Sequence, residues 1–582
     1  MTKMKAGQAL AKVLESWDVD HLYGITADSI NNTVDGLYQE RENLKYIQVR
    51  HEEVGALAAA ADAKLTGKIG VSFGSAGPGA THLFNGLYDA KMDHAPVLAI
   101  VGQSSTEVMN TNFFQEMNQD PMFTDVAVFN KQVVSAQQIP YVVDAAIRAA
   151  YANKGPAVVI IPDNLSGQEI DYSPLKTDKV YEKAMISAIS TDSIDRTIAM
   201  IKEAKHPVLW IGKGVAGARD EVVQVSADFQ MPVVTAIPGT GIMPTDNPSF
   251  MGSMGRLGTK PAFEVAQAAD LVLFVGTNFP FARFWPSNVK VIQVNNNAED
   301  LGKQHDADLA ILADAKIFLD DLLSRNVKLT ASDWLKAAQE DKANWDQWLD
   351  GLANDDSKGL RAESVIKAIK ENSTDSSVFG LDVGNNTEWA MRQLPLNRDQ
   401  KFTLSGWFAT MGYGLPAGLA AKLSYPDRQV FSISGDGGYA MVMQDLLTEV
   451  KYNLPVINVV LENQSFGFIQ HEKLVANQAP YGIDLIGANW AHIADDMGAI
   501  GFTATDLPSL QAAFKKIKEL EASGNTKPIV LDAKIRNVDP VDTGFMPLDP
   551  DQFDEKTIQA FRDQYELGDQ PALSTILKQR SK

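Results

Sequence analysis

The chain has 582 residues, of which 45% are hydrophobic and 21% are charged, as in ordinary globular proteins of about three domains. Its net charge of -21 argues against a surface for nucleic acid or acidic membranes, and its lack of cysteine excludes disulfides, thiolate nucleophiles and Cys-ligated metal sites. The N-terminus has no secretory apolar region and no run reaches the ~18 apolar residues of a spanning helix, so we expect a cytoplasmic protein.

Short β-branched runs alternate with helical stretches along the whole chain. Examples are KIGVSFG, PAVVIIP, HPVLWIG, ADLVLFVG, RQVFSIS and LPVINVVLE, and many of these runs end close to Gly, Asn or Asp. Runs that are apolar on both faces are typical of parallel strands that are buried on both sides and joined by crossover helices. The pattern therefore predicts an α/β fold with three doubly wound parallel-sheet domains.

Two segments lack this alternation and are interpreted as connections between domains. Residues 172–192 are polar, and residues 331–359 form a charged helical stretch with Trp334, Trp345 and Trp348. The expected domains are residues 1–180, 190–340 and 355–545, followed by a C-terminal tail at 546–582.

In the first domain, a strand that ends at Val49 leads into Arg50-His51-Glu52-Glu53 and an Ala-rich helix. An acid in the first turn of a helix interacts favourably with the helix dipole. The residues alone therefore leave Glu52 open to either a structural or a functional interpretation.

In the third domain, the strand RQVFSIS precedes Gly435-Asp436-Gly437-Gly438, and the strand LPVINVVLE precedes Asn463. Because ligands of open α/β sheets bind beyond the carboxyl ends of the strands, we expect Asp436 and Asn463 to reach one crevice. One carboxylate and one amide oxygen suit a hard cation such as Mg2+, with a diphosphate supplying further oxygens. The glycines allow close approach of phosphate, and the helix N-terminus adds a favourable dipole.

This series is similar to the motif of the thiamine-diphosphate enzymes, which begins with Gly-Asp-Gly and ends in Asn. The resemblance implies that Asp436 and Asn463 bind Mg2+ through their side chains and that Ser465 binds it through its backbone carbonyl. The family often ends the motif in two Asn, and here Glu462 takes the first place, which leaves the metal ligands intact. The expected diphosphate contacts are Gly435, Gly437 and Gly438.

Residues 46–103 resemble the pyrimidine-binding domain of the same enzymes, with RHEE, the Ala-rich helix and GSAGPGATH in the same order. Thiamine chemistry needs a carboxylic acid that hydrogen-bonds the aminopyrimidine and works best when desolvated. Glu52 matches this acid by position, and Glu53 is expected to be structural. Met411 in WFATMGYGLPAG matches the residue that keeps the cofactor bent, and Val383 in LDVGNN matches a contact of the aminopyrimidine.

Nearly the whole chain resembles the pyruvate oxidases, a family of phosphate-dependent bacterial flavoenzymes, in segments such as FFQEMNQDPMF, LGKQHDADLAILADA and FGFIQHEK. The resemblance implies conversion of pyruvate, phosphate and O2 into acetyl phosphate, CO2 and H2O2 through a thiamine ylide and FAD. Phe114 and Gln115 match residues that line the substrate pocket. Phe468 and Glu472 match residues between thiamine and flavin and beside the reacting acid. In this family two subunits build each site, so we expect a homo-oligomer, by resemblance a tetramer.

The same resemblance implies that the middle domain binds FAD at its strand ends, in WIGKG, VVTAI, MGRLG, VGTNFPF, IQVNNN and LADA. The diphosphate of FAD would meet backbone amides there, with a charge from Arg256. In related thiamine decarboxylases this domain binds no flavin, so a purely structural middle domain is the alternative. The expected FAD contacts are Gly212, Gly214, Thr235, Gly255, Arg256, Gly276, Thr277, Asn278, Asn295, Asp314 and Ala315.

Three places depart from the family pattern. Thr26-Ala27-Asp28 stands where the family has Pro-Gly-Gly or Pro-Ser-Gly, so we expect backbone strain wherever a glycine would take positive φ, and the added carboxylate would oppose an anionic substrate. Asn295-Asn296-Asn297 replaces an acidic pattern, and Trp389 stands where smaller or polar residues are usual. We expect these changes to affect substrate, flavin affinity and rate more than the fold.

Three other functions stay open. A carboligase or decarboxylase that resembles acetolactate synthase would use the same chemistry without net oxidation and without O2 uptake. A non-catalytic homologue would bind cofactor without turnover, although retention of Glu52, Asp436 and Asn463 argues against it. A quinone-linked, membrane-activated oxidase would need an amphipathic tail, and the tail here is mixed and interrupted at Gly568 and Pro571. We therefore expect no stable membrane association.

Overall fold

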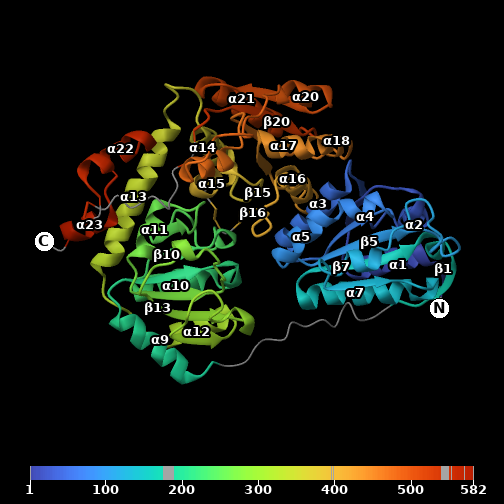
Figure 1. The fold of residues 1–582 in the computed structure, drawn as a ribbon, viewed down its shortest axis with the longest axis horizontal. Helices are drawn as coiled ribbons and strands as arrows, with labels where there is room; N and C mark the ends of the chain where they lie inside the picture. Colours follow the sequence, from blue (N-terminus) through green and yellow to red (C-terminus); the bar gives the residue numbers. More distant parts are fainter. Residues whose placement is uncertain are drawn as a thin grey trace. The chain divides into compact units, whose positions relative to one another are not determined.

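A computed structural model describes residues 2–174, 189–394, 396–397, 399–538, 540, 550–551, 553–568 and 570–580. The chain forms two compact units (Figure 1). The first unit contains Met1–Glu182, Ser376–Asn386 and Lys401–Asn537, and the second contains Lys183–Asp375, Thr387–Gln400 and Val538–Lys582. Most of the predicted connection at 172–192 lies outside the described residues, and the predicted domain boundaries stay predictions.

The first unit begins with a parallel sheet in the order β3-β2-β4-β5-β7-β6, and a short antiparallel pair, β1 with β8, lies apart from it. Its central strands β5 and β7 are buried along their whole length, which explains why both read as continuous apolar runs. Helices α3 and α5 contribute to the core on one face, and α1 and α7 to the core on the other. The elements are β1 (Thr2–Lys5), α1 (Ala6–Ser16), β2 (His21–Gly24), α2 (Asn31–Gln39), β3 (Lys45–Gln48), α3 (Glu52–Thr66), β4 (Gly70–Gly74), α4 (Pro78–His82), α5 (Phe84–Met92), β5 (Val97–Gln103), α6 (Gln119–Met122), β6 (Phe129–Gln132), α7 (Ile139–Asn153), β7 (Pro156–Pro162), α8 (Asp163–Ser166) and β8 (Glu169–Tyr172).

The alanine-rich helix α3 is enclosed on nearly every side, and residues 54–63 are all buried. Its backbone is approached directly by two glycines, because a Cβ at Gly70 would lie 1.9 Å from the carbonyl oxygen of Ala59, and one at Gly86 would lie 2.4 Å from the carbonyl carbon of Ala56. The small side chains of α3 therefore allow strand β4 and helix α5 to pack against it at backbone distance.

The second sheet of the first unit is also parallel, in the order β16-β15-β17-β18-β20-β19. Helix α16 packs against α3, so the two sheets of this unit share one core. The elements are β15 (Val378–Leu381), β16 (Lys401–Leu404), α16 (Gly414–Ser424), β17 (Val430–Gly435), α17 (Asp436–Val442), η8 (Met443–Asp445), α18 (Leu446–Lys451), β18 (Ile457–Glu462), α19 (Gly467–Val475), α20 (Trp490–Asp496), β19 (Ile500–Ala504), α21 (Leu507–Ala522) and β20 (Ile529–Lys534). Helix α15 (Asn385–Gln393) starts in this unit, and its residues from Thr387 on belong to the second unit.

The crossover between β17 and β18 is divided into α17, η8 and α18. At the end of η8 the Asp445 carboxylate accepts the backbone N–H of Arg50 and the hydroxyl of Thr448, both at 2.8 Å. Burial raises the pKa of Asp445 to about 6. The break therefore places a carboxylate beside the turn that leads into α3.

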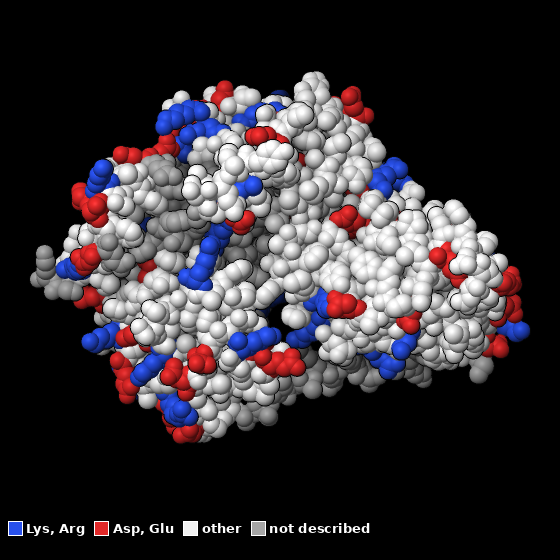
Figure 2. Space-filling model, in the orientation of Figure 1, with Lys and Arg blue, Asp and Glu red and all other residues white. Residues whose placement is uncertain are grey.

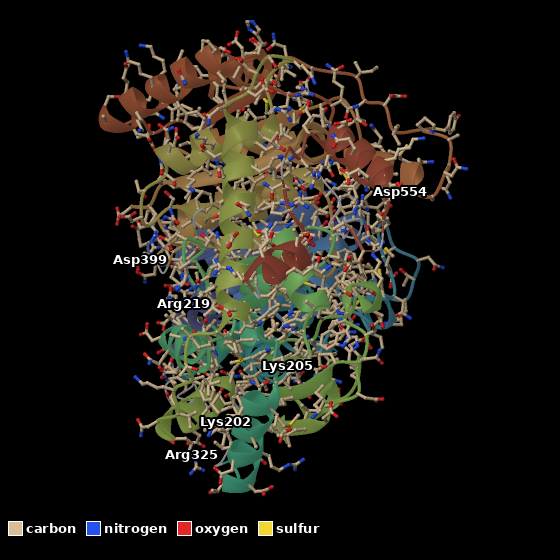
Figure 3. The ribbon with its side chains drawn as sticks, turned by 90° about the vertical axis from the view of Figure 1, so that its left-hand side faces the viewer. Lys202, Lys205, Arg219, Arg325, Asp399 and Asp554 are labelled. Carbon is tan, nitrogen blue, oxygen red and sulfur yellow. The ribbon has the colours of Figure 1, made fainter. Side chains whose placement is uncertain are left out.

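The second unit contains a third parallel sheet, in the order β11-β10-β9-β12-β13-β14. The direction of the strand order reverses between β9 and β12, which is where open α/β sheets form a ligand crevice. Helix α9 lies beside α12, and Figure 3 shows Lys202 of α9 and Arg325 after α12 at the same end of the unit. The elements are α9 (Thr191–Glu203), β9 (Pro207–Ile211), α10 (Arg219–Phe229), β10 (Val233–Thr235), β11 (Phe250–Ser253), α11 (Lys260–Gln267), β12 (Leu271–Val275), β13 (Lys290–Asn295), β14 (Leu309–Leu312), α12 (Ala315–Ser324), α13 (Asp333–Ala353), α14 (Ala362–Asn372), α22 (Glu555–Tyr565) and α23 (Leu573–Arg580).

The predicted connection at 331–359 contains the 21-residue helix α13, which packs into the core of the second unit. Trp334 and Trp345 are buried, and the Trp334 Nε1–H donates to the carbonyl of Pro207 at 3.0 Å. The C-terminal tail also joins this core, because Leu573 and Ile576 of α23 are buried there. Helical pattern alone did not distinguish a linker from a core helix.

A buried group of charges joins α11, α13 and α23. Lys260 pairs with Glu264 at 3.1 Å and with Asp341, and a second bond runs from the Leu573 N–H to the Glu264 carboxylate at 2.7 Å. Burial raises the pKa of Glu264 to about 7, although Lys260 acts in the opposite direction. The first N–H of α23 therefore donates to the Glu264 carboxylate, and the buried Lys260 balances the charge of that carboxylate.

The surface mixes both signs of charge, and Figure 2 shows acidic and basic side chains interspersed over the visible face. Among the described residues, no helix is long and apolar enough to cross a membrane.

We predict that Lys260→Met destabilises the second unit by about 3–5 kcal/mol, because it leaves Glu264 and Asp341 buried without their cation. Chemical denaturation followed by tryptophan fluorescence measures the change. Lys336→Met is the matched control, because Lys336 is half exposed and makes only a 3.8 Å surface pair with Asp333. Equal stabilities of the two variants would contradict the predicted role of the buried lysine.

Candidate active site

The Gly-Asp-Gly segment lies where the sequence places it, at the carboxyl end of a strand. Strand β17 ends at Gly435, and α17 begins at Asp436. Strand β18 ends at Glu462 and is the neighbour of β17, with Gly435 in register with Leu461. Asp436 and Asn463 therefore follow adjacent strands at the same edge of the sheet.

The Asp436 carboxylate joins these two strand ends. Its Oδ1 accepts the N–H of Gly437 at 3.0 Å, and its Oδ2 accepts the N–H of Gln464 at 2.9 Å. Burial raises the pKa of Asp436 to about 6, and the nearby charge of Glu462 contributes in the same direction. A bound cation would favour the ionised carboxylate, so the position suits a metal ligand.

The glycines of this segment differ in the space around them. A Cβ at Gly437 would lie 2.8 Å from the Phe466 ring, and one at Gly438 would lie 2.7 Å from an oxygen of Asp382, so packing requires both glycines. At Gly435 the nearest atom within 4 Å is Asn386 Oδ1 at 3.9 Å, which leaves open space beside the start of α17. That space and the adjacent helix N-terminus fit a diphosphate group.

The ligands expected for Mg2+ form an incomplete set by themselves. Asn463 Oδ1 accepts the N–H of Ser465 at 3.2 Å, and the Ser465 hydroxyl donates to Gln470 at 2.7 Å, which directs that side chain toward α19. No group of three or more His, Cys, Asp or Glu suited to a metal occurs among the described residues. A metal at Asp436 would therefore need oxygens from elsewhere, and a diphosphate has the right chemistry to supply them.

A second buried carboxylate, which the sequence interpretation missed, lies at the end of the neighbouring strand β15. Asp382 Oδ1 accepts the N–H groups of Val383 at 2.7 Å, Gly412 at 2.9 Å and Tyr413 at 3.3 Å. Burial raises the pKa of Asp382. Asp382 thus fixes both Val383 and the turn after Met411, and its place directly after the apolar strand VFGL was the signal that could have found it.

Glu52 is the first residue of α3 and is almost fully buried. Its Oε2 lies 2.9 Å from Nδ1 of His82, whose ring stacks on the ring of His51 at 4.2 Å. A Cβ at Gly79 would lie 3.1 Å from Glu52 Oε1, so glycine at this position leaves room beside the carboxylate. His82 was also missed, although it stands in the quoted GSAGPGATH segment.

Glu53 has a structural role in this turn, as expected. Its N–H donates to Nδ1 of His51 at 3.3 Å, and its carboxylate accepts the side-chain amide of Asn85. The Glu52 carboxylate is thus left to face His82 and the turn at Gly79.

Phe114 and Gln115 lie in a loop that is organised by the next residue, Glu116. Its carboxylate accepts the backbone N–H groups of Asn110 and Phe113, and these bonds lower the pKa of Glu116. Gln115 has a φ of 59° and lies against the turn at Gly77, whereas Phe114 is 71% exposed. Phe468 and Glu472 lie one turn apart on α19, at the spacing that places side chains on the same face.

The residues expected to contact FAD follow the strands of the central sheet. Close backbone packing marks the switch point, where the Gly214 N–H donates to the Gly276 carbonyl at 2.8 Å and a Cβ at Gly212 would lie 2.4 Å from Thr277. Gly255 and Arg256 follow β11. These glycines satisfy packing in this structure, and their proximity to a flavin stays a prediction.

Several other candidates in this sheet have structural partners. The Thr235 hydroxyl donates to backbone carbonyls, and Asp314 caps α12, which begins at the buried Ala315. Asn295 is buried, and its Oδ1 accepts the Asn297 N–H at 3.0 Å. A carboxylate lies beside this segment, because Asp300 accepts hydrogen bonds from Asn278 at 3.0 Å and from Asn297 at 3.2 Å.

The backbone strain expected at Thr26-Ala27-Asp28 does not arise, because none of these residues takes positive φ. Ala27 has φ −158° and ψ 168°, which is extended backbone that any residue adopts, and neither neighbour has positive φ. Trp389 is buried and hydrogen-bonds Glu363 in the interior of the second unit. That larger residue is therefore accommodated by a polar partner.

Comparison with known proteins identifies the class of enzyme. Models of the thiamine pyrophosphate enzymes match the N-terminal TPP-binding domain at residues 4–122, the central domain at 194–322 and the C-terminal TPP-binding domain at 382–533. The chain therefore belongs to the thiamine pyrophosphate enzyme family.

Individual relatives within this family differ in how similar they are to the chain. The chain is 41% identical to a pyruvate oxidase of Lactiplantibacillus plantarum, over 99% of this chain and 96% of that protein. It is 39% identical to the putative thiamine pyrophosphate-containing protein YdaP of Bacillus subtilis, over 93% of each. A probable acetolactate synthase large subunit of Methanocaldococcus jannaschii is 30% identical, over 91% of this chain and 92% of that protein.

We predict that Asp436→Ala abolishes Mg2+-dependent binding of thiamine diphosphate, because it removes the charged side chain at the strand end. Titration of the cofactor at fixed Mg2+, followed by calorimetry, measures the loss. Asp496→Ala on the exposed face of α20 is the control and should titrate like the parent. An unchanged titration of the Asp436 variant would place the metal elsewhere.

We predict that Glu116→Gln loosens the loop at 110–116 and raises the KM for the substrate several-fold with little change in thermal stability. The lowered pKa means that the ionised carboxylate stabilises the loop above its ordinary pKa of about 4.5 and that this support is lost as pH falls through the lower folded value. Steady-state kinetics and limited proteolysis check both effects. A loop equally resistant to protease in the variant would be the contrary result.

Proposed function

We propose that this protein is a thiamine-diphosphate- and FAD-dependent pyruvate oxidase that converts pyruvate, phosphate and O2 into acetyl phosphate, CO2 and H2O2. The observation that carries the proposal is 41% identity to a pyruvate oxidase over 99% of the chain, against 30% to an acetolactate synthase. The buried Glu52 and the strand-end Asp436 support thiamine chemistry, which needs a desolvated carboxylic acid and a carboxylate ligand for the metal.

The residues at the edge of the second sheet would bind the thiamine cofactor. Asp436, Asn463 and the Ser465 carbonyl would bind Mg2+, and the open space at Gly435 would receive the diphosphate. Bound thiamine diphosphate supplies a nucleophilic carbon for the 2-oxo acid, and bound FAD supplies an acceptor for two electrons. Each of these contacts is a proposal.

Glu52 would exchange a proton with the aminopyrimidine ring. Its burial keeps water away, which strengthens a hydrogen bond to the ring, and His82 orients the carboxylate through Oε2 at 2.9 Å. The second oxygen, which lies toward Gly79, is the one that this arrangement leaves for the cofactor.

A homo-oligomer follows from the same proposal. The loop that carries Phe114 and the segment between α19 and α20 expose large apolar side chains in the single chain, including Phe114 at 71%, Tyr481 at 86% and Ile486 at 96%. Exposed apolar side chains of this size favour burial against a partner. A second copy would cover them, and a tetramer is the assembly we propose.

A carboligase that forms acetolactate is the second candidate. The identity of 30% to an acetolactate synthase and the uncharged Asn295-Asn296-Asn297 segment favour it. It would use the same thiamine site, and its product would form without consumption of O2.

Flavin reduction tests the proposal directly. Protein loaded with FAD, Mg2+ and thiamine diphosphate should lose its flavin absorption when pyruvate is added without air, and air should restore it. Glu52→Gln keeps the shape but has no proton to give, so it should bind FAD and stay coloured with pyruvate.

With air and phosphate, the parent protein should consume one O2 for each acetyl phosphate formed. Acetolactate formation without O2 uptake would favour the carboligase, and failure to bind FAD well above micromolar concentration would overturn the oxidase.

A further inference from the structure

The loop between β16 and α16 is fixed by side chains from helices α3 and α5 and from the residue after α5, which belong to the other half of the same unit. Asp93, which follows α5, accepts the N–H of Gly406 through Oδ2 and the N–H of Trp407 through Oδ1, both at 3.0 Å. Lys64 of α3 donates to the carbonyl of Leu404 at 3.0 Å. The start of the loop is therefore attached to the face of α3 and α5.

Lys64 is buried between two carboxylates, at 2.6 Å from Asp89 and 2.5 Å from Asp93. Burial acts to lower the pKa of Lys64, but these carboxylates outweigh it and the pKa is raised. The lysine is thus charged at neutral pH. It holds the Asp93 carboxylate in the position from which Asp93 accepts the N–H groups of Gly406 and Trp407.

The end of the loop is attached by Asn85 of α5. Asn85 Nδ2 donates to the Thr410 hydroxyl oxygen at 2.8 Å and also to Glu53, the residue after Glu52. The Thr410 hydroxyl in turn donates to the carbonyl of Met411 at 3.1 Å. A continuous line of hydrogen bonds therefore runs from the first turn of α3 to Met411.

This conformation of the loop costs backbone strain at one residue. Ala409 has a φ of 57°, in the left-handed region that non-glycine residues rarely adopt. Such residues persist where surrounding contacts determine the backbone, and they gather at functional loops. The contacts on either side of Ala409 are those made by Asp93 and Asn85.

We propose that Asn85 is a positioning residue that sets the place of Met411 through Thr410, and thereby the affinity for thiamine diphosphate. The inference rests on the proposed function in one respect, the contact of Met411 with the bent cofactor. Asn85 itself touches neither cofactor nor substrate in this scheme. Its effect is transmitted by the backbone of residues 410–411.

The test is a mutant cycle on cofactor affinity. Asn85→Ala should weaken binding of thiamine diphosphate at saturating Mg2+ by roughly 2- to 12-fold, which corresponds to one hydrogen bond. In a Met411→Ala background the same change should have little further effect, because the residue through which Asn85 acts is gone. Calorimetry on the assembled protein measures each dissociation constant.

Two further variants make the test specific. Thr410→Val removes the same hydrogen bond from the loop side, so it should reproduce the Asn85→Ala effect and covers the case in which that variant folds poorly. Asn153→Ala is the matched control, because the Asn153 amide donates only to the Ala149 carbonyl on the exposed end of α7. Its affinity should equal that of the parent.

The outcomes separate the inference from the proposed function. Two results would show that the positioning role is wrong while the cofactor site stands, provided that Met411→Ala weakens binding. In one, Asn85→Ala has no effect alone. In the other, Asn85→Ala weakens binding by its full amount even in the Met411→Ala background. If Met411→Ala binds the cofactor like the parent, the proposed contact of Met411 fails, and the inference fails with it.

Discussion

At the carboxyl edge of the second sheet, two buried carboxylates fix the loops by accepting backbone N–H groups where parallel strands end. Asp382 follows β15 and Asp436 follows β17, and these two strands are neighbours. Hydrogen bonds to charged groups contribute about 1.5–3 kcal/mol each, enough to fix loops that have no sheet partner. Burial raises the pKa of both groups, so the bonds are made by carboxylates that lack full hydration.

The sequence was informative wherever local pattern and tertiary position agree. Asp436 and Asn463 could be placed together because each directly follows an apolar run, and parallel strands bring such positions to one edge. Asp382 satisfies the same rule, because it directly follows the apolar strand β15. The rule, applied to every strand end, would have found all three.

Other features could not be predicted because they depend on contacts between distant segments. At the division of the β17–β18 crossover, Asp445 accepts a hydrogen bond from the N–H of Arg50, nearly four hundred residues earlier. Helix α13 has the polar surface of a linker, and only the tertiary structure shows Trp334 inserted against β9. The backbone conformation of Ala27 was also not predictable from its residue type, because Ala27 is extended and carries no strain.

The run of small residues in α3 limits how this protein can change over generations. At Ala56 and Ala59 the helix meets Gly86 and Gly70 at backbone distance, so a side chain at either glycine would separate α3 from helix α5 or from strand β4. No substitution in α3 can compensate for such a change, because the added atom would meet the backbone of the helix itself. Selection should therefore preserve these two glycines in any functional lineage, and they should serve as a marker of descent when the surrounding loops have diverged beyond recognition.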